Sequence, residues 1–399
     1  TSLPALRHAV IVGAPPSADP FWISYETLMD APTSHHEIEA DPNAVVEIAF
    51  TSGSTGEPKG VMLTANGIRA DGDTIATACG LSENDVFFMA STLGHQLGFS
   101  VGLRMPLSLG ARVVYQEHWN PEEAVELIER EKVTFTCSTP TFLVDLLRAR
   151  NLKEHPLSSL KVWLLAGAVA PASLHEEARE KLPGLALATV FSMTEVGAVI
   201  INPPGAAPDH ALATGRAPRG VRLKVIDDGG NEVARGEEGE LVIRTHSLFA
   251  GYFRRGAITR ASFTDDGFFR SGDRVRIDEN GYLFVTGRIK DLIKRGGESI
   301  SPVEIEGILV RHPKVADVAV IGMPDERLGE KVCACVVTHS GETLTLGELL
   351  KWVEAAKVAK QKWPERLELC ASLPRTSIGK VQKSELRDMV ARKLAAEKK

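Results

Sequence analysis

The sequence predicts an α/β protein whose first part holds mostly parallel β-strands. Short apolar runs at 133–137, 162–165 and 185–191 alternate with segments of helical spacing, the pattern of strand–helix–strand units. After about residue 210 short strands are separated by Asp, Gly and Asn turns, which favours a small antiparallel subdomain, with a β-barrel as one form of it. From about residue 290 the pattern is that of a small α+β domain. The predicted regions are 1–210, 211–289 and 290–399.

The elements of the first region follow from local patterns. Val45–Phe50 predicts a buried strand, and residues 64–80 predict a helix that ends at Gly80. Asn120-Pro121-Glu122-Glu123 predicts a helix start, because Asn is a favoured N-cap and Pro is favoured at the first helical position. The other predicted elements are the strands Ala9–Val12 and Asp85–Met89 and the helices Thr139 to about Arg150 and Pro171–Leu182. Ligands bind beyond the carboxyl ends of such parallel strands. The loops after Phe50, Leu165 and Phe191 are therefore the predicted binding edge.

Turn and cap signals organise the later regions. Asp278-Glu279-Asn280-Gly281 predicts a hairpin turn. Ser301 with Glu304, and Thr345 with Glu348, have the spacing of a capping box and so predict two helix N-termini. The predicted strands are Val221–Asp227, Glu240–Arg244, Arg274–Asp278, Tyr282–Thr286, Ala316–Ile321 and Val332–Thr338, and a last helix begins near Ser384.

Composition bounds the class of protein. The 399 residues are 43% hydrophobic and 25% charged, which is ordinary for a globular protein with full cores. A net charge of −6 gives no reason to expect nucleic acid or an anionic membrane as a partner. Five cysteines without disulfide-like spacing favour a reducing compartment, so we expect a cytoplasmic protein. No apolar stretch reaches the roughly 18 residues of a membrane span, and no signal peptide opens the chain.

The stretch from Thr51 to Gly60 carries the clearest chemistry. It holds three glycines, four hydroxyl residues and one lysine directly after a predicted strand. Glycines let backbone N–H groups form an anion-binding nest, and hydroxyls and Lys59 suit phosphate oxygens. It is not a Walker A loop, because no Gly stands immediately before Lys59 and Gly60 stands where Ser or Thr is required. A polar surface loop is the simpler alternative. The candidate phosphate-binding residues are Thr51, Ser52, Gly53, Ser54, Thr55, Gly56 and Lys59.

Four further stretches follow this loop in a fixed order. They are Phe191-Ser192-Met193-Thr194-Glu195, Ser271-Gly272-Asp273, Gly287 to Glu298, and Pro374 to Lys380. Together the five stretches resemble the adenylate-forming superfamily of acyl-CoA synthetases, luciferase-like enzymes and peptide-synthetase adenylation domains. The resemblance covers essentially all of the chain. It implies a large N-terminal domain of parallel αβ sheets plus a small β-barrel, without its first subdomain here, and a small mobile α+β C-terminal domain.

Three segments place the resemblance nearest to short- and medium-chain or alicyclic acyl-CoA synthetases: His95–Phe99, Arg295–Pro302 and Met323–Glu330. The implied reaction joins a carboxylic acid to ATP as an acyl-adenylate with release of pyrophosphate, after which the thiol of CoA attacks. The implied cofactors are ATP, Mg²⁺ and CoA as co-substrate. The first step brings two anions together, so cations and N–H donors must neutralise charge at the α-phosphate.

The resemblance also implies the principal catalytic residues. Lys380 is the adenylation lysine, with a solvated lysine in a Lys-rich C-terminus as the alternative. Glu195 holds Mg²⁺, which commonly takes one or two carboxylates beside phosphate oxygens. Thr194 donates to the α-phosphate.

Further residues are implied around the nucleotide. Asp273 accepts from the ribose hydroxyls, since a carboxylate can take two hydrogen bonds. Arg288 supports the ribose or phosphate, with a structural ion pair at the domain junction as the alternative. Gly167, Ala168 and Ser192 lie in the segments expected against adenine and the acyl group.

Two features concern the second half-reaction. Lys290 falls at the implied hinge of the C-terminal domain, and Gly296 and Gly297 would line a narrow tunnel for the pantetheine arm. A hinge absorbs a change in φ and ψ and need not be glycine. His95 stands at the implied acyl pocket, with a helix-start or core histidine as the alternative.

The sequence also limits the substrate. No acidic residue stands beside His95 to hold an ammonium group, which disfavours an α-amino acid. The expected pocket residues are Phe99, Gly167, Ser192, Val196 and Gly197. They are mostly apolar or small, so we expect an uncharged aliphatic, alicyclic or aryl acid.

The chain departs from the family pattern at two points. Phe191-Ser192 replaces the usual Tyr-Gly, and we expect this either to reshape the acyl pocket or to loosen an adenine contact, without removing a catalytic group. Only fifty residues precede Thr51, whereas a full member carries a further subdomain on the order of 100 residues or more. Because the chain also begins with Thr1 rather than Met, we expect either a piece of a longer polypeptide or an unusually short protein.

Other functions stay open at this point. The chain could perform one half-reaction only, accepting a preformed adenylate or acylating a carrier protein instead of CoA. It could also be a non-catalytic nucleotide-binding module. The sequence is compatible with a homodimer and does not identify the acid.

Overall fold

The computed structural model describes residues 9–13, 21–30, 41–51, 58–168, 170, 172–206, 213–376 and 381–397. It divides into two compact units, Thr1–Asp41 and Pro42–Lys399, each described by itself. In the first unit, β1 (Ala9–Ile11) pairs in parallel with β2 (Trp22–Ser24), and α1 (Tyr25–Met29) follows. The strand predicted at Ala9–Val12 is confirmed to within one residue.

The second unit contains the predicted parallel sheet. Its strand order is β10-β9-β8-β7-β5-β6, and among the described residues every neighbouring pair is parallel except β9 with β10. The strands are β5 (Val86–Met89), β6 (Arg112–Tyr115), β7 (Phe135–Ser138), β8 (Val162–Ala166), β9 (Ala186–Met193) and β10 (Gly197–Asn202). The three strands predicted from apolar runs, β7, β8 and β9, are adjacent in this sheet.

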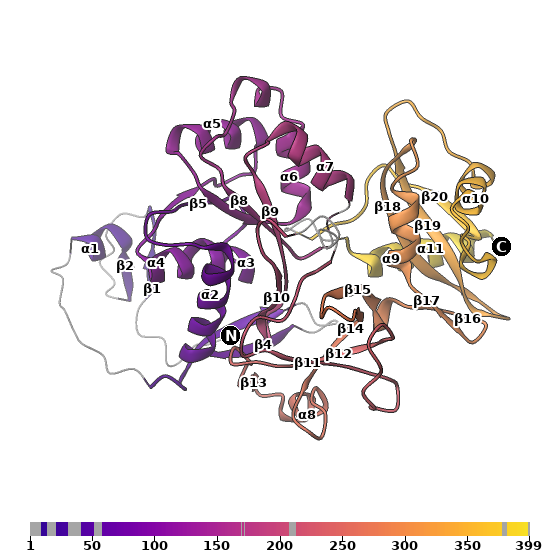
Figure 1. The fold of residues 1–399 in the computed structure, drawn as a ribbon, viewed down its shortest axis with the longest axis horizontal. Helices are drawn as coiled ribbons and strands as arrows, with labels where there is room; N and C mark the ends of the chain where they lie inside the picture. Colours follow the sequence, from indigo (N-terminus) through magenta and orange to yellow (C-terminus); the bar gives the residue numbers. More distant parts are fainter. Residues whose placement is uncertain are drawn as a thin grey trace. The chain divides into compact units, whose positions relative to one another are not determined.

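Helical segments cover both faces of this sheet (Figure 1). They are α2 (Ala65–Cys79), α3 (Gln96–Phe99), the π-helix η1 (Ser100–Arg104), α4 (Met105–Leu109), α5 (Pro121–Glu131), α6 (Pro140–Leu147), η2 (Leu152–Glu154) and α7 (Ala172–Lys181). Because side chains alternate along a strand, Trp163 and Leu165 pack against α5, α6 and α7, whereas Leu164 and Ala166 pack toward α2, η1 and α4. The sheet is therefore buried on both faces.

Several helix ends form as the sequence predicts. α2 ends at Gly80, which adopts the left-handed φ of +65° that glycine accepts without strain. The side chain of Asn120 accepts a hydrogen bond from the Glu123 N–H at 3.0 Å and caps α5. Thr345 and Glu348 form the predicted reciprocal capping box at the start of α10 (Leu346–Ala355).

The capping box predicted at Ser301 is wrong, although α9 (Pro302–Leu309) does begin there. The Ser301 hydroxyl donates instead to the carbonyl of Thr286, and Glu304 forms an ion pair with Lys362 at 2.7 Å. Tertiary partners thus compete successfully with the local cap, which the spacing of residues alone could not reveal.

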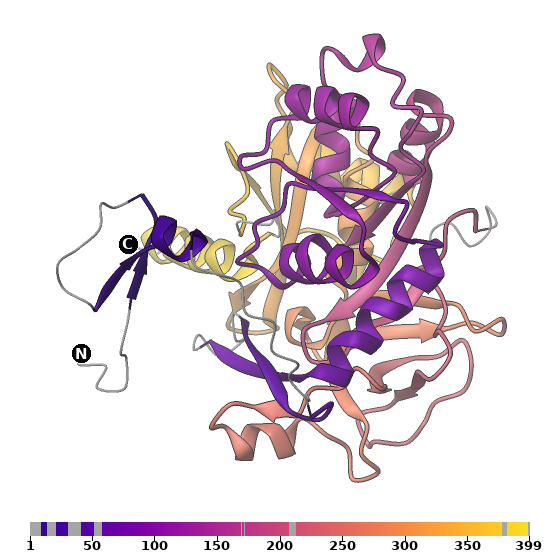
Figure 2. The same cartoon turned by 90° about the vertical axis from the view of Figure 1, so that its left-hand side faces the viewer.

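The strand before the glycine-rich loop lies in a different sheet from the one predicted. β3 (Val45–Thr51) and β4 (Lys59–Thr64) form an antiparallel hairpin, and β4 also pairs with β13 (Gly251–Tyr252). Figure 2 shows this hairpin near α2. β4 begins at Lys59, only eight positions after β3 ends at Thr51 (59 − 51), whereas a parallel pair needs a connection of a dozen or more residues. β3 is also not buried as predicted: among the described residues it lies at one end of its sheet, and Val46 is 56% exposed and Phe50 is 70% exposed.

The predicted antiparallel subdomain is a four-stranded sheet in the order β11-β12-β14-β15. Its elements are β11 (Arg222–Ile226), β12 (Glu238–Arg244), β14 (Phe269–Ile277), β15 (Leu283–Arg288) and the nearby α8 (Gly256–Ala261). The hairpin turn predicted at Asp278–Gly281 joins β14 to β15, with Gly281 at a φ of +81°. In the part of the chain that the structure describes, β11 and β15 are the two ends of the sheet, so it is open rather than closed into a barrel.

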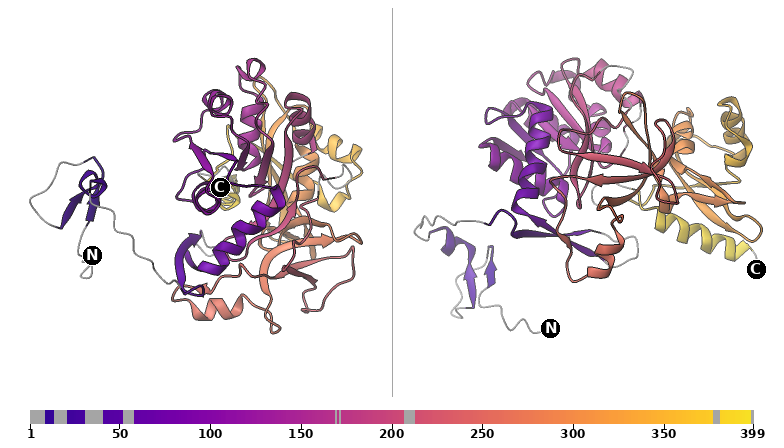
Figure 3. Two further views of the ribbon diagram at one scale, coloured as in Figure 1. Left: turned by 60° about the vertical axis from the view of Figure 1, so that its left-hand side comes forward. Right: turned by 60° about the horizontal axis from the view of Figure 1, so that its bottom comes forward.

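The last part of the chain is an α+β layer (Figure 3). Its elements are η4 (Ile289–Asp291), β16 (Ile293–Arg295), β17 (Glu298–Ile300), β18 (Val315–Asp325), β19 (Gly329–Thr338), η5 (Lys360–Lys362), β20 (Arg366–Leu369) and α11 (Lys383–Glu397), together with α9 and α10. Ile305 of α9 and Leu349 of α10 pack on one face of the sheet, and Leu386 of α11 packs on the other. Among the described residues, no helix has the length and apolar content needed to cross a membrane.

Candidate active site

A cavity of about 710 Å³ brings together residues that are far apart in the sequence. Two sets of residues face it, and we name them by their origin. The strand wall consists of Thr51, Lys59, Thr194, Glu195, Ser271, Arg288 and Lys290, at or near the ends of strands. The helix wall consists of Gly67, Ile68, Asp71 and Ile75 of α2 with Gln96, Ser100 and Arg104 of α3 and η1.

Glu195 is the carboxylate of the strand wall. It stands two residues after the end of β9, is 9% exposed, and accepts a hydrogen bond of 2.8 Å from the Tyr252 hydroxyl. Burial, and then the Glu195 carboxylate, raise the pKa of Tyr252, so its hydroxyl remains a donor. The Lys59 ammonium lies 4.8 Å from the centre of the Tyr252 ring, within the range of a cation–π contact. One tyrosine therefore orients both an anion and a cation at the edge of the cavity.

Arg288 and Lys290 supply further positive charge. The Arg288 Nε lies 2.9 Å from Oδ1 of the buried Asp273, which it faces across the pairing of β14 with β15. Lys290 follows in η4. Although its side chain is largely exposed, partial desolvation first and the neighbouring Arg288 second lower the pKa of Lys290. The ion pair fixes the guanidinium while leaving it on the cavity wall.

The helix wall depends on close packing of one helical segment. His95 caps α3 by accepting a hydrogen bond of 3.1 Å from the Leu97 N–H through Nδ1. Gly102 of η1 lies against Met89 of β5, where an added Cβ would come within 2.5 Å of the Met89 Cγ. The missing side chain lets the segment approach the sheet, and Gln96, Ser100 and Arg104, each four residues apart, reach the cavity.

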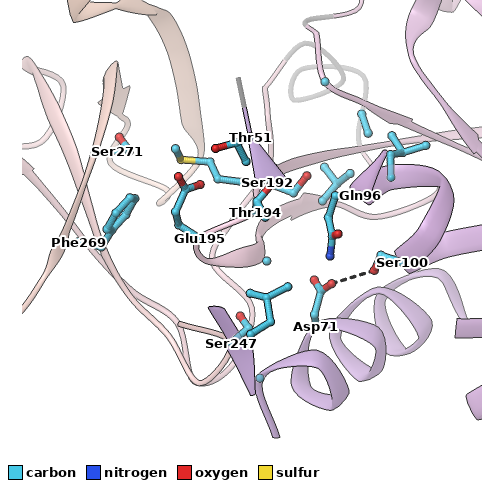
Figure 4. Close-up of a pocket in the computed structure, with 18 of the residues that line it drawn as sticks. Thr51, Asp71, Gln96, Ser100, Ser192, Thr194, Glu195, Ser247, Phe269 and Ser271 are labelled. Atoms are coloured by element: carbon cyan, nitrogen blue, oxygen red, sulfur yellow. Dashed lines mark hydrogen bonds between the residues drawn. The ribbon is translucent and has the colours of Figure 1, made fainter. Parts of the chain in front are cut away.

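Asp71 is the carboxylate of the helix wall (Figure 4). Its Oδ1 accepts from the Ala198 N–H at 2.7 Å, and its Oδ2 accepts from the Ser100 hydroxyl at 3.1 Å. Burial raises the pKa of Asp71, while these two donors and then the charge of Arg104 oppose the shift. Arg104 itself pairs with Glu47 at 2.9 Å.

Two protein-family models match this chain. The family model described as "AMP-binding enzyme" matches residues 2–253, and "AMP-binding enzyme C-terminal domain" matches residues 304–380. The chain belongs to the AMP-binding enzyme family.

Individual relatives agree with this assignment. The chain is 38% identical over 349 residues to the medium-chain fatty-acid–CoA ligase of Escherichia coli (strain K12), a match that spans 87% of this chain and 61% of that protein. It is 33% identical to the indoleacetate–CoA ligase of Aromatoleum aromaticum, over 98% of this chain and 76% of that protein. The ATP-bound MatB of Rhodopseudomonas palustris superposes with a TM-score of 0.84 at 30% identity, covering 92% of this chain and 72% of MatB. The chain thus spans less than two thirds of the first of these relatives.

The residues that resemblance to AMP-binding enzymes singled out fall into three groups. Many of them line the one cavity: Thr51, Lys59, His95, Gly167, Ser192, Thr194, Glu195, Arg288 and Lys290. The second group lies outside the described residues and consists of Ser52, Gly53, Ser54, Thr55 and Gly56 of the glycine-rich loop together with Lys380. The third group is described but is not among the residues that line the cavity: Ala168, Asp273, Gly296 and Gly297.

Gly296 and Gly297 form the turn between β16 and β17. Both have positive φ, +58° and +91°, and the Gly296 N–H donates to the Leu328 carbonyl at 2.8 Å. An added Cβ would have nothing within 4 Å at Gly297 and would meet the Leu328 side chain at 3.2 Å at Gly296. The turn therefore requires glycine for its backbone conformation.

Two expectations about the acyl pocket need correction. Val196 is fully buried in the core, and Phe99 lies beneath the Arg104 guanidinium at 5.6 Å, so neither lines the cavity as expected. The cavity also contains an acidic residue, Asp71, that the sequence prediction did not consider. Asp71 was missed because it belongs to a helix 24 residues before His95 (95 − 71). The four-residue spacing of Gly67, Asp71 and Ile75 is the signal that places it on one helix face.

His95 combines two of the roles considered for it. It caps a helix, as the structural alternative supposed, and it also lines the cavity. Its Nδ1 is occupied as an acceptor from Leu97, which holds the ring in place.

Proposed function

We propose that this chain is an ATP-dependent acyl-CoA synthetase, an AMP-forming acid–thiol ligase that makes an acyl-adenylate and then transfers the acyl group to CoA. The observation that carries the proposal is the strand wall. Four sequence stretches separated by up to about 230 positions contribute charged and hydroxyl groups to one cavity. The family and the named CoA ligases among the relatives support the same reaction.

The strand wall suits the adenylation step. Lys59, with the N–H groups of the adjoining loop, is assigned to the β- and γ-phosphates, and Thr194 to the α-phosphate. Arg288 is held by Asp273 and is assigned to the phosphate or ribose. Asp273, which directly follows the cavity-lining Gly272, remains the proposed ribose acceptor. These groups would offset the charge that develops when the carboxylate attacks.

Glu195 is the proposed Mg²⁺ ligand. Among the described residues, no group of three or more His, Cys, Asp or Glu side chains could hold a metal by itself. A single carboxylate fits Mg²⁺ nonetheless, because this ion is usually bound by one or two carboxylates together with substrate phosphates and water. The Tyr252 hydroxyl occupies one acceptor site of Glu195 and leaves others for the metal. When bound, Mg²⁺ would neutralise phosphate charge.

The remaining assignments concern domain movement and the acceptor. Lys380 is the proposed adenylation lysine. We assign Lys290 as the hinge at the proposed boundary between residues 211–289 and 290–399. Gly296 and Gly297 are proposed to line the pantetheine path. Their turn carries no side chain, so a thin thiol arm could pass close to the backbone.

The substrate is proposed to be a carboxylic acid with an apolar aliphatic, alicyclic or aryl body. Val101, Leu164 and Val190 also line the cavity and, with Ile75 of the helix wall, give it an apolar surface. His95, Gly167 and Ser192 would shape this space rather than react. CoA brings its own thiol, so no enzyme nucleophile is required.

The test separates the two half-reactions. ATP–pyrophosphate exchange is measured over a panel of acids, and CoA-thioester formation is measured from a preformed acyl-adenylate. We expect Lys380→Ala to lower exchange about 10²- to 10³-fold while thioester formation from the adenylate is retained. Lys351→Ala, at an exposed position of α10, is the matched control and should leave both rates unchanged.

The other outcomes distinguish the alternatives. Acylation of a carrier protein without CoA would identify a carrier-loading enzyme. Calorimetric binding of ATP without turnover of any acid would identify a nucleotide-binding module instead. Absence of both exchange and thioester with every acid would contradict the proposed activity.

A further inference from the structure

The helix wall contains a charged group that the proposed adenylation step does not use. Asp71 is the acidic residue among the α2 positions that face the cavity, where its described neighbours are Gly67, Ile68 and Ile75. Asp is a poor residue for a helix interior, and a carboxylate in an apolar environment is costly unless it is hydrogen-bonded. Its presence on this face therefore calls for partners.

The protein supplies two such partners. The Ala198 N–H and the Ser100 hydroxyl each donate to one oxygen of Asp71, which ties α2 to β10 and η1. An ionised carboxylate can accept about four hydrogen bonds, so the two oxygens keep acceptor capacity. Because Asp71 lines the cavity, this capacity is available to a bound molecule.

The backbone beside Asp71 leaves room for the carboxylate. Gly197 has a φ of +68°, and a Cβ there would come within 2.8 Å of Asp71 Oδ1 and 3.0 Å of the Ser247 hydroxyl. Both Gly197 and Ser247 line the cavity. The absence of a side chain at Gly197 thus leaves room for Asp71 and Ser247 between α2 and the start of β10. We call Asp71, Gly197 and Ser247 the polar corner.

This polar corner lies away from the proposed site of adenylation. In the view of Figure 4, Asp71, Gln96 and Ser100 are on one side, Glu195 and Ser271 are on the other, and Ser192 and Thr194 lie between. An acid whose carboxylate is held near Thr194 would direct its other end toward Asp71. A purely apolar end would leave the remaining acceptor capacity of Asp71 unused in a desolvated site.

Resting on the proposed function, we propose that Asp71 is a specificity-determining residue that accepts a hydrogen bond from a hydroxyl or amino group on the substrate acid, remote from its carboxylate. The two donors share the chemistry that a carboxylate recognises. An amino group would also bring a positive charge opposite Asp71, whereas a hydroxyl would not. The experiment therefore tests hydroxyl-bearing acids and amino-bearing acids separately.

The experiment uses acids matched in size. Hexanoate is compared with 6-hydroxyhexanoate and 6-aminohexanoate, and benzoate with 4-hydroxybenzoate and 4-aminobenzoate. ATP–pyrophosphate exchange reports activation, and calorimetric binding of each acid in the absence of ATP reports recognition alone. We expect a donor-bearing acid to exceed its parent by about ten- to a hundredfold in kcat/KM, since hydrogen bonds to charged groups are strong and unmet ones are costly.

Asp71→Asn is the decisive variant. The Asn side chain can still accept a hydrogen bond from the Ala198 N–H. It is uncharged, however, and its amide oxygen is a weaker acceptor than a carboxylate oxygen. We expect the ratio of kcat/KM for the donor-bearing acid over its parent to fall at least about tenfold. Asp73→Asn is the matched control, because Asp73 lies on the exposed side of the same helix and pairs with Arg69 at 2.9 Å. The control should leave the ratio unchanged.

The outcomes separate this inference from the proposed function. An equal loss for both members of each pair in Asp71→Asn would show a structural tie only and would overturn the inference. Exchange by the wild type without preference for any donor-bearing acid would overturn it as well. Preferential binding of a donor-bearing acid without exchange would support the inference and contradict the proposed activity. If no acid binds and none is activated, both proposals fail.

Discussion

The two walls of the cavity differ in how their polar groups reach it. Thr194, Glu195 and Arg288 of the strand wall stand at or next to strand ends, each inside a short run of residues that is recognisable by itself. Asp71 and Ser100 of the helix wall belong to helical segments, and they meet only because α2 packs beside η1. We infer that the strand wall carries the chemistry common to all substrates and that the helix wall selects among them.

The difference gives a criterion for sorting variants. A change on the strand wall should alter activation of every acid by the same factor. A change on the helix wall should alter the acid selected, or the stability of the site, with ATP handling preserved. The predictions below test this division.

The largest effect is expected from Glu195→Gln on the strand wall. The amide keeps an oxygen that can accept from Tyr252 but removes the charge proposed to hold Mg²⁺. We expect exchange to fall about 10²- to 10³-fold for every acid, the scale seen when one electrostatic contact to a reacting centre is lost. Exchange rates at several Mg²⁺ concentrations are the measurement.

Tyr252→Phe provides the comparison for that variant. It removes the hydrogen bond of 2.8 Å to Glu195 but leaves the carboxylate and the aromatic ring near Lys59. A much smaller loss than in Glu195→Gln is expected. If the two variants lose the same fraction of exchange activity, the orientation of the Glu195 carboxylate matters more than its charge. If Glu195→Gln lowers exchange with some acids and not with others, the division of roles between the two walls is wrong.

The sequence predicted the strand wall better than the helix wall for a physical reason. A strand buried on both faces is a continuous apolar run, so Val162–Leu165 marks β8 and the loop beyond it directly. Helix starts at Asn120 and Thr345 are likewise set by a side chain and a backbone group a few residues apart. Local patterns suffice where local interactions decide.

The failures all involve partners distant in the sequence. The Ser301 hydroxyl donates to the Thr286 carbonyl instead of capping its own helix, and β3 lies at one end of its sheet among the described residues. The helix wall is the clearest case. The spacing of Asp71 and Ile75 shows a shared helix face, but its meeting with Ser100 depends on packing across 29 positions.

A medium effect is expected from Gly197→Ala on the helix wall. The new methyl group would lie 2.8 Å from Asp71 Oδ1, in a backbone conformation with φ of +68°. Left-handed backbone costs an L-residue about 1–2 kcal/mol, and overpacking costs typically about 1–3 kcal/mol more. We also expect the KM for the acid to rise and the KM for ATP to stay the same. Urea unfolding and steady-state exchange are the measurements.

Gly205→Ala isolates the backbone contribution. Gly205 has a similar φ of +78°, but an added Cβ would meet nothing within 4 Å. Its loss of stability should be confined to about 1–2 kcal/mol, with both KM values unchanged. An equal loss of stability in the two variants would mean that the Asp71 side chain can move to accept the added methyl group. Gly197 would then not determine how Asp71 is positioned.

The smallest effect concerns the charge of Asp71 itself. Burial raises the pKa of Asp71 above the usual value of about 4. Between that value and the higher pKa in the folded chain, the folded chain binds more protons than the unfolded one. Stability therefore decreases as the pH rises through this window, and above it the buried charge has a constant cost. Asp71→Asn removes the cost, so its free energy of unfolding should exceed that of the wild type at neutral pH.

That excess should shrink as the pH falls toward about 4 and vanish below it, where the carboxyl group becomes neutral in both states. Urea unfolding across this range is the measurement, with Asp73→Asn as the control for losing an exposed charge on α2, a change of roughly 0–1 kcal/mol. The only charged partner found to act on Asp71 within the described residues is Arg104, which opposes the shift. A variant less stable than the wild type at every pH would mean that the hydrogen bonds from Ala198 and Ser100 outweigh burial. In that case the main role of Asp71 is to hold α2 in place, and selection among acids is a secondary role of the helix wall.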